Sequence, residues 1–348
     1  MSQAARSVVL LHGGPVSDAL GEAVKRCVAA LGVDVQWHDV DAGARAVLAG
    51  ERAMPEHVIA AIRSAGVALK PLLRTPVGNG YGSPNVQLRK DLGVFAGVRP
   101  LRPLRGLRTP YTGFDIVLVR ELTEGTYAGI EHDIIPGVVE TIKVTTAAKC
   151  ERVVEFAFDW AERHGRRQVC VVHKANIMKM SDGMFVRIGQ DVAARHPTIG
   201  FRDIIVDNCA MQMVARPEQF DVLVADSMFG DILGDIGAGL IGSPVAVASI
   251  NVAPDTTVFE GTWHVPADTA HGPEVTANPL ALLMPATEML SFFGETAAAS
   301  QLRQAIECVL LDGAVRTPDL GGRASTFAMT TAIIAALERG ATTAPVPA

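Results

Sequence analysis

The sequence predicts an α/β protein of two domains, and three observations support this prediction. Within the first hundred residues, short apolar runs alternate with stretches of helical spacing, which is the pattern of a sheet flanked by helices. The chain has 348 residues, more than one ordinary hydrophobic core accommodates. Hydrophobic residues make up 49% of it and charged residues 20%, so the chain can bury a large interior.

The first elements follow from this alternation. We expect a strand from Ser7 to Leu11, a helix from Ser17 to Leu31 with Ser17 as its N-cap, and a second strand from Val33 to Trp37. The turn His12-Gly13-Gly14-Pro15 follows the first strand, where glycine lets the backbone approach a ligand. It lacks the G-x-G-x-x-G pattern, so the sequence does not predict a classical Rossmann fold.

Composition argues against several classes of function. The net charge of −6 gives no basis for binding nucleic acid or an anionic membrane. No apolar run reaches the ~18 residues of a membrane span, so we expect a soluble protein. The cysteines are scattered without a C-x-x-C pair, which speaks against a disulfide framework or a zinc site and fits reduced thiols in the cytoplasm. They are Cys27, Cys150, Cys170, Cys209 and Cys308.

A glycine-rich stretch from Thr75 to Gly82 reads as a loop, and a helix is expected to begin at Ser83. Arginines follow at Arg89, at Arg99 before a proline, and at Arg120, where the apolar run 116–119 ends. Each of them alone could be a surface or ion-pair residue. Together they suit a pocket for a di- or tricarboxylate, because a guanidinium binds carboxylates in bidentate fashion and stays charged.

Two carboxylates, Asp231 and Asp235, are four residues apart and therefore lie one turn above the other if this stretch is helical. One interpretation is that they are acids in the first turn of a helix, where the dipole favours negative charge. The other is that a cation lies between them and offsets their repulsion.

The remaining elements are expected at helical or strand spacing. Strands are predicted for 138–143, 166–172 and 245–252, a helix for 148–164, and a continuation of the Asp235 helix for 236–241. Ala157, Phe158 and Trp160 are interpreted as core residues. Residues 341–348 read as a disordered tail rich in alanine, threonine and proline.

Residues 120–132 read R-E-L-T-E-G-T-Y-A-G-I-E-H and resemble the R-E-N-T-E-G-x-Y-x-G-x-E-H segment of the metal-dependent β-decarboxylating dehydrogenases, the isocitrate and 3-isopropylmalate dehydrogenase family. Residues 83–100 are similar to S-x-N-V-x-L-R-K-x-L-x-L-F-A-x-V-R-P, residues 172–185 to the family's lysine segment, and residues 207–235 to D-x-x-x-M-Q-x-V-x-x-P-x-x-F-D followed by G-D-I-x-x-D. The resemblance covers roughly residues 66 to 260, with a weaker match to about 330.

The resemblance implies the two-domain fold of that family. A large, cofactor-side domain would comprise 1–97 and 248–340, and a small domain with dimerisation elements would comprise 98–247. In this family the strands near 138–143 clasp a second subunit, so two chains share each site. The chain is therefore expected to form a homodimer with shared active sites.

The resemblance also assigns roles to single positions. The substrate residues fall on Ser83, Asn85, Arg89, Arg99 and Arg120, the metal ligands on Asp231, Asp235 and the partner's equivalent of Asp207, and the catalytic residues on Tyr127 and Lys174, with Lys174 donated across the dimer. The residue types agree, because carboxylate ligands select Mg²⁺ or Mn²⁺, which a 2-hydroxy acid can chelate. Lys174 could accept the hydroxyl proton and Tyr127 could return a proton to carbon.

The cofactor segments depart from the family. The loop F-E-x-x-H-G-S/T-A-P reads F-E-G-T-W-H-V-P-A-D here, and the N-terminal G-D-G-I-G-P-E has become H-G-G-P-V-S-D. Asp268, or Thr269 in another alignment, occupies the ribose-binding position, and no Lys, Arg or Tyr lies between Glu260 and Gly272 to meet a 2′-phosphate, which favours NAD over NADP. The cofactor-binding positions are predicted to be Thr75, Glu260, His264, Asp268 and Asn278. His264 and His271 are not expected to form a metal pair, because they are seven residues apart in a loop.

These expectations combine into NAD-dependent oxidative decarboxylation of a 2-hydroxy-3-carboxy acid, with isocitrate favoured by Ser83 and Asn85. The same chemistry on homoisocitrate, 3-isopropylmalate or a specialised tricarboxylate or phosphonate analogue is one alternative. A non-catalytic regulatory subunit that binds citrate-like anions or nucleotides is another.

Overall fold

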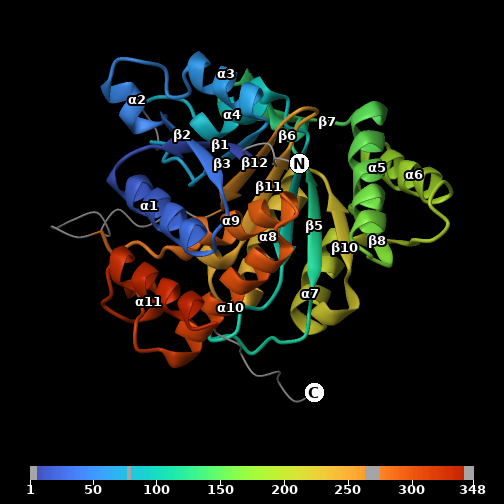
Figure 1. The fold of residues 1–348 in the computed structure, drawn as a ribbon. Coiled ribbons are helices and arrows are strands. Elements are labelled where there is room, and N and C mark those ends of the chain that lie inside the picture. Colours follow the sequence, from blue (N-terminus) through green and yellow to red (C-terminus); the bar gives the residue numbers. More distant parts are fainter. Residues whose placement is uncertain (1–5, 77–79, 263–274, 341–348) are drawn as a thin grey trace.

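The computed structural model describes residues 6–76, 80–262 and 275–340, which fold into a ten-stranded sheet flanked by helices and a separate two-stranded hairpin (Figure 1). The strands are β1 (Arg6–His12), β2 (Val35–Asp41), β3 (Val67–Lys70), β4 (Ala96–Leu101), β5 (Ile116–Glu121), β6 (Gly125–Ile135), β7 (Val138–Val144), β8 (Gln168–His173), β9 (Gly200–Ile205), β10 (Val222–Ala225), β11 (Ala248–Val252) and β12 (Thr257–Gly261). The α-helices are α1 (Pro15–Ala30), α2 (Ala44–Leu48), α3 (Glu56–Ala65), α4 (Pro84–Leu92), α5 (Ala147–Arg163), α6 (Ser181–Ala193), α7 (Val206–Ala215), α8 (Ser227–Ile241), α9 (Leu280–Phe292), α10 (Thr296–Asp312) and α11 (Thr326–Glu338).

The large sheet is mixed, with the order β2-β1-β3-β12-β11-β4-β5-β10-β8-β9. Its central pairs β12–β11, β11–β4 and β4–β5 are antiparallel, whereas the pairs on either side are parallel. The predicted α/β class is therefore confirmed, and so is the absence of a classical Rossmann fold, whose sheet is mostly parallel.

The two halves of the sheet come from different parts of the sequence. Strands β1, β2, β3, β11 and β12 form one half, and β5, β8, β9 and β10 form the other, with β4 between them. Segments 1–97 and 248–340 thus lie together, apart from most of 98–247. The predicted boundary at 97/98 falls inside β4, so the division into two domains stays a proposal.

Helices α5 and α8 cover opposite faces of the central strands. On β4, Arg99 and Leu101 face α8, since added Cβ atoms at Gly234 and Gly237 would touch them, whereas Pro100 lines a cavity together with α5 residues. Successive side chains of a strand point to opposite faces. The polar residues of β4 and β5 on the α8 side are therefore separated by the sheet from the α5 side.

Most predicted elements are confirmed with small shifts, and one capping residue is wrong. Ser83 caps α4, and helix α5 buries Ala157 and Phe158 as expected, whereas Trp160, also predicted to be a core residue, is half-buried and lines a cavity. The first helix begins at Pro15 after Gly14, so Ser17 is not the N-cap; its Oγ instead accepts hydrogen bonds from Gly13 N and Gly14 N at 2.7 and 2.8 Å. Strand β2 starts two residues later than predicted, and β11 three residues later, because 244–246 form a 3₁₀ turn.

Strands β6 and β7 form an antiparallel hairpin outside the large sheet; β7 matches the strand predicted for 138–143, whereas β6 was not predicted. Its apolar side chains are exposed in the single chain; Ile135 and Val139 each keep 60% of their surface accessible. An isolated hairpin of this kind is marginally stable in water. The hairpin therefore presents apolar surface that suits an interface.

The described residues contain no helix that is long and apolar enough to cross a membrane. All five cysteines are free thiols. Burial raises the pKa of Cys27 to about 12, so this thiol stays protonated and unreactive at neutral pH.

A buried polar network joins the β3–β12 pair to α4. Lys70 at the end of β3 is fully buried, and its Nζ donates to Glu260 Oε1 at 2.6 Å and to Asn85 Oδ1 at 2.8 Å. Glu260 also accepts from Asn251 at 2.7 Å and from Arg89 at 3.2 Å. Burial alone would raise the pKa of Glu260, but Lys70 and Arg89 outweigh it and lower this pKa to about 2. The network fixes Arg89 relative to the sheet.

Replacing Glu260 with glutamine would leave Lys70 buried without its counter-charge. We expect Glu260→Gln to reduce the free energy of unfolding by about 3–5 kcal/mol at neutral pH. Because the pKa of Glu260 is about 2 in the fold against an ordinary 4.5, its stabilising contribution is complete above that ordinary value and is lost as the pH falls toward 2.

Urea unfolding at several pH values measures both effects, and the gap between variant and wild type should narrow from about pH 5 to about pH 3. Glu56→Gln, on an exposed surface, serves as the control and should change stability by less than about 0.5 kcal/mol. A Glu260→Gln variant as stable as this control would contradict the ion-pair assignment.

Candidate active site

Helix α8 carries glycines where the arginine side chains of the sheet cross it. A Cβ atom at Gly230 would lie 2.7 Å from Arg120 Cγ, and one at Gly234 would lie 2.1 Å from Arg99 Nη1. Both approaches are far shorter than van der Waals contact. The spacing G-D-I-L-G-D therefore combines two features: the glycines admit the arginines, and the following aspartates receive their charges.

Asp231 is the centre of the site. Its Oδ1 accepts a hydrogen bond from Arg99 at 3.2 Å and a shorter one from Arg120, and its Oδ2 accepts one from Tyr127 at 2.8 Å. Arg120 also donates from Nε to Ser227 O at 2.7 Å, and its guanidinium lies 5.1 Å from the Tyr127 ring centroid. These contacts bring the end of β4, the end of β5, the hairpin and α8 to one place.

The electrostatics follow from this crowding. Arg120 is only 4% exposed, and burial together with the nearby Arg99 and Arg89 lowers its pKa to about 10 despite the attraction of Asp231. Burial alone would raise the pKa of Asp231, but the three arginines and Tyr127 hold it below its ordinary value. The predicted convergence of Arg89, Arg99 and Arg120 is thus present. Together with Lys70 these arginines carry four positive charges, against the three negative charges of Asp231, Asp235 and Glu260. An anionic ligand can supply the missing negative charge.

The residues before α4 occupy two different environments. Thr75 Oγ1 donates to Ser83 Oγ at 3.1 Å, and both belong to the partly exposed start of the helix. Asn85 is buried, and its amide bonds to Lys70 and to the Leu73 backbone. Asn85 therefore holds the loop in place, and its role in binding substrate stays a prediction.

Lys174 and Asp207 form a second cluster. Lys174 follows β8, Asp207 lies in the first turn of α7, and their side chains form an ion pair that lowers the pKa of Asp207. Asp207 keeps 70% of its side-chain surface exposed. Among the described residues, no hydrogen bond or ion pair joins this pair to Asp231. Within one chain the predicted site residues therefore lie in two groups.

A chain of ion pairs that sequence reasoning missed connects these groups. Lys143 Nζ pairs with Asp182 at 2.6 Å and with Asp226 at 2.6 Å. Asp182 accepts from the backbone N of Lys174, and Asp226 caps α8 by accepting from Phe229 N. Lys143 thereby fixes the position of Lys174 relative to the start of the Asp231 helix. The one sequence signal for this contact was the position of Lys143 at the end of a predicted strand rich in β-branched residues.

The predicted cofactor-binding residues lie in different environments. His264 and Asp268 lie outside the described residues. Glu260 is 1% exposed and belongs to the Lys70 network, so the prediction that it contacts a cofactor directly is not supported by its position. Asn278 is also buried; it donates to Asp319 Oδ2 at 2.9 Å and accepts from Leu280 N.

The carboxylates of Asp231 and Asp235 are chemically suited to bind a divalent cation. The acids are not in the first turn of α8, which Asp226 caps, so helix capping does not explain them. Both lie near Arg99, and Asp235 lines a cavity of about 460 Å³ that extends to Thr262 at the end of β12. Hard carboxylate oxygens suit Mg²⁺ or Mn²⁺. The third predicted ligand, Asp207, belongs to the other cluster.

The fold and this site define an α/β protein in which three arginines converge on a helix that carries a pair of carboxylates. The chain belongs to the isocitrate/isopropylmalate dehydrogenase family, whose sequence profile matches residues 9–337. It is 39% identical over 336 residues to mitochondrial NAD isocitrate dehydrogenase regulatory subunit 2 of Arabidopsis thaliana, covering 96% of this chain and 90% of that protein. It is 36% identical to catalytic subunit 5 of the same plant, covering 94% and 87%.

The fold also matches a solved structure. The crystal structure of isocitrate dehydrogenase from Methylococcus capsulatus superimposes with a TM-score of 0.88 at 40% sequence identity, covering 95% of this chain and 99% of that one. The family resemblance expected from the sequence is thus confirmed.

The contact between Tyr127 and Asp231 can be tested by titration. Burial and the Asp231 carboxylate raise the pKa of Tyr127 above its ordinary value of 10.0. In Asp231→Asn we expect this pKa to fall, because the negative charge is lost while Arg120 remains. The absorbance of the phenolate, followed as the pH is raised, reports the pKa of Tyr127. Subtracting the titration of a protein with Tyr127→Phe removes the signal of the other two tyrosines. An unchanged Tyr127 titration in Asp231→Asn would show that the two side chains are not in contact.

Proposed function

We propose that this protein catalyses the NAD-dependent oxidative decarboxylation of a 2-hydroxy-3-carboxy acid, with isocitrate as the first candidate. The observation that carries the proposal is the arrangement of Arg99, Arg120 and Tyr127 around Asp231 on α8. The family membership supports it, as do the names of the relatives.

Different residues of the site bind different groups of the substrate. Arg89, Arg99 and Arg120 hold the carboxylates of the substrate, and Ser83 at the start of α4 adds a hydroxyl. Arg120 is the most rigid of these residues, since it is buried and bound to Ser227 O and Asp231. A planar, immobile guanidinium orients a carboxylate with little loss of entropy.

Tyr127 and Lys174 move the protons. Lys174 takes the proton of the substrate hydroxyl. The raised pKa of Tyr127 keeps its phenol protonated, so that it has a proton to deliver to carbon after CO₂ has left. Mg²⁺ or Mn²⁺, held by Asp231, Asp235 and the partner's equivalent of Asp207, would supply Lewis-acid polarisation of the substrate oxygen when bound. NAD, or less favourably NADP, would supply the hydride acceptor when bound.

A homodimer with shared active sites explains the two separate clusters. Lys174 and Asp207 are accessible on the chain surface, near apolar side chains such as Ile177 and Met211 that are also exposed. The hairpin β6–β7 adds a second exposed apolar surface. Lys174 and Asp207 of one chain would then complete the Asp231 site of the other.

The second candidate function is a non-catalytic subunit that binds citrate-like anions or nucleotides. It is favoured by the regulatory subunits among the relatives. The catalytic proposal takes precedence because Tyr127, Lys174, Asp207, Asp231 and Asp235 are all present. The free thiols favour a reducing compartment such as the cytoplasm, although the named plant relatives are mitochondrial.

Turnover tests the leading proposal directly. With Mn²⁺ and NAD⁺, the protein should reduce the cofactor with isocitrate faster than with homoisocitrate, 3-isopropylmalate, malate or tartrate. Asp231→Asn should lower kcat by at least about a hundredfold at saturating substrate, because it weakens both the metal site and the anchoring of Arg120. Asp312→Asn, an exposed acid at the end of α10, is the control. Absence of turnover of every acid together with intact nucleotide binding would favour the regulatory function.

Mixing two inactive variants tests the shared site. Asp231→Asn and Lys174→Met should each be inactive as homodimers. After joint refolding in equal amounts, a mixed dimer holds one site with both residues intact, so activity should return to about a quarter of wild type for random pairing. Mixing either variant with itself is the control. No recovery from a mixture shown to contain mixed dimers would mean that both residues act within one chain.

A further inference from the structure

A second cavity lies on the α5 side of the sheet, opposite the side that carries Arg99 and Arg120. It measures about 440 Å³, within the range of small-molecule sites. Its floor is formed by the central strands, with Pro100 of β4 and Val117 of β5, and its walls by α5 and α9. None of the residues assigned above to substrate or metal lines it.

The walls are aromatic on both sides. Phe156 and Trp160 of α5 lie 5.9 Å apart between ring centroids, and Phe292 of α9 contacts Phe259 of β12 edge to face at 5.6 Å. Phe292 keeps 56% of its surface accessible. The His164 ring stacks on Trp160 at 4.0 Å between centroids, so Phe156 and Phe292 are the rings that offer free surface to a flat apolar group.

Glu288 of α9 stands in this apolar wall without a partner. No hydrogen bond or ion pair joins its carboxyl group to any residue in the described part of the chain, although α9 is otherwise buried among apolar residues. Burial raises the pKa of Glu288, against the opposing effect of Arg102 and Arg303. Glu288 is half-buried rather than enclosed, so its unpaired carboxylate is open to a donor group of a ligand in the cavity.

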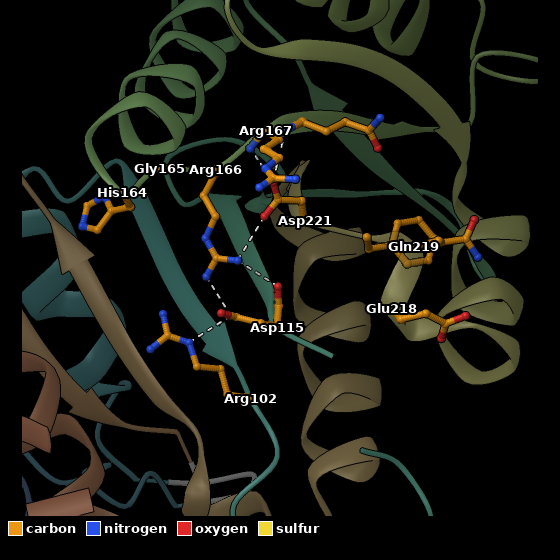
Figure 2. Close-up of a pocket in the computed structure, with 11 residues that line it drawn as sticks. Arg102, Asp115, His164, Gly165, Arg166, Arg167, Glu218, Gln219 and Asp221 are labelled. Atoms are coloured by element: carbon orange, nitrogen blue, oxygen red, sulfur yellow. Dashed lines mark hydrogen bonds and ion pairs between the residues drawn. The ribbon is translucent and has the colours of Figure 1, made fainter. Parts of the chain in front are cut away.

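Arg102 and Arg163 form the charged rim of the cavity. Figure 2 shows Arg102 and Arg166 both directed at Asp115. Asp115 Oδ1 accepts a hydrogen bond from Arg102 Nε at 2.9 Å and another from Arg166 Nη2 at 2.7 Å, and the first of these holds Arg102 at the rim. Within the described residues, the terminal amino groups of Arg102 make no hydrogen bond. Arg102 and Glu288 both line this one cavity. A donor site and an acceptor site are therefore both available in it.

We propose that this cavity, which we call the back-face cavity, binds an aromatic α-amino acid. The ring lies between Phe156 and Phe292, the ammonium group donates to Glu288, and the carboxylate accepts from Arg102. Ammonium and carboxylate are attached to one carbon in such a ligand, so a single molecule carries groups for both Glu288 and Arg102, which line the same cavity. The proposal does not depend on the dehydrogenase activity.

Calorimetric titration with L-phenylalanine tests the site. We expect saturable binding of one ligand per chain and quenching of Trp160 fluorescence. 3-Phenylpropionate, without the amine, and phenethylamine, without the acid, should each bind at least about tenfold more weakly, since each loses one charge-assisted hydrogen bond. Trp160→Phe should remove the fluorescence change but not the heat of binding.

Variants locate the binding in the cavity. Glu288→Gln and Phe292→Ala should each weaken binding at least about tenfold, while Glu338→Gln, the same change at the exposed end of α11, should leave it unaltered. If circular dichroism shows that Glu288→Gln does not fold, the affinity of Phe292→Ala, at an exposed position, decides whether the ligand binds in the cavity. Absence of saturable binding to wild type, or wild-type affinity in the folded variants, would overturn the proposal. Asp231→Asn should bind L-phenylalanine normally, which separates this result from the test of turnover.

Discussion

The balance of charge around Asp231 is the interaction on which the rest of the site depends. Arg99 and Arg120 would repel each other in a partly buried place if no carboxylate lay between them. Asp231 supplies that charge and also orients Tyr127. It can do so only because Gly230 and Gly234 leave room for the arginine side chains along α8. Helix composition, strand ends and hairpin position are therefore linked through one carboxylate.

The buried pair of Lys70 and Glu260 extends this link into the large sheet. Glu260 accepts from Arg89, and Arg89 in turn affects the pKa of both Arg120 and Asp231. The orientation of one substrate arginine thus depends on a carboxylate that no solvent reaches. Since buried ion pairs add little net stability compared with apolar packing, their value here lies in fixing position. That explains why a fully buried lysine is tolerated beneath an anion site.

Sequence reasoning predicted those features that depend on local pattern. The α/β alternation, the N-cap Ser83, the helical register of Asp231 and Asp235 and the convergence of three arginines all follow from spacing and motif. It missed features that depend on distant partners. The sequence motif placed Glu260 in a loop, whereas its contacts place it in the core. Its partner Lys70 lies 190 residues away in the chain, so no local pattern indicates the contact. Asp226 was overlooked for the same reason, and the position of Lys143 at the end of a β-branched strand did not reveal its two carboxylate partners, which lie on α6 and before α8.

The alternation of side chains along β4 and β5 connects the two cavities physically. Arg99 and Pro100 are neighbours in sequence but face the cleft and the back-face cavity respectively, and Arg120 and Val117 do the same on the adjacent strand. These strands also lie where the two halves of the sheet meet. Because side chains alternate along a strand, a ligand in the back-face cavity and an anion between the arginines would contact opposite faces of the same two strands without sharing a side chain.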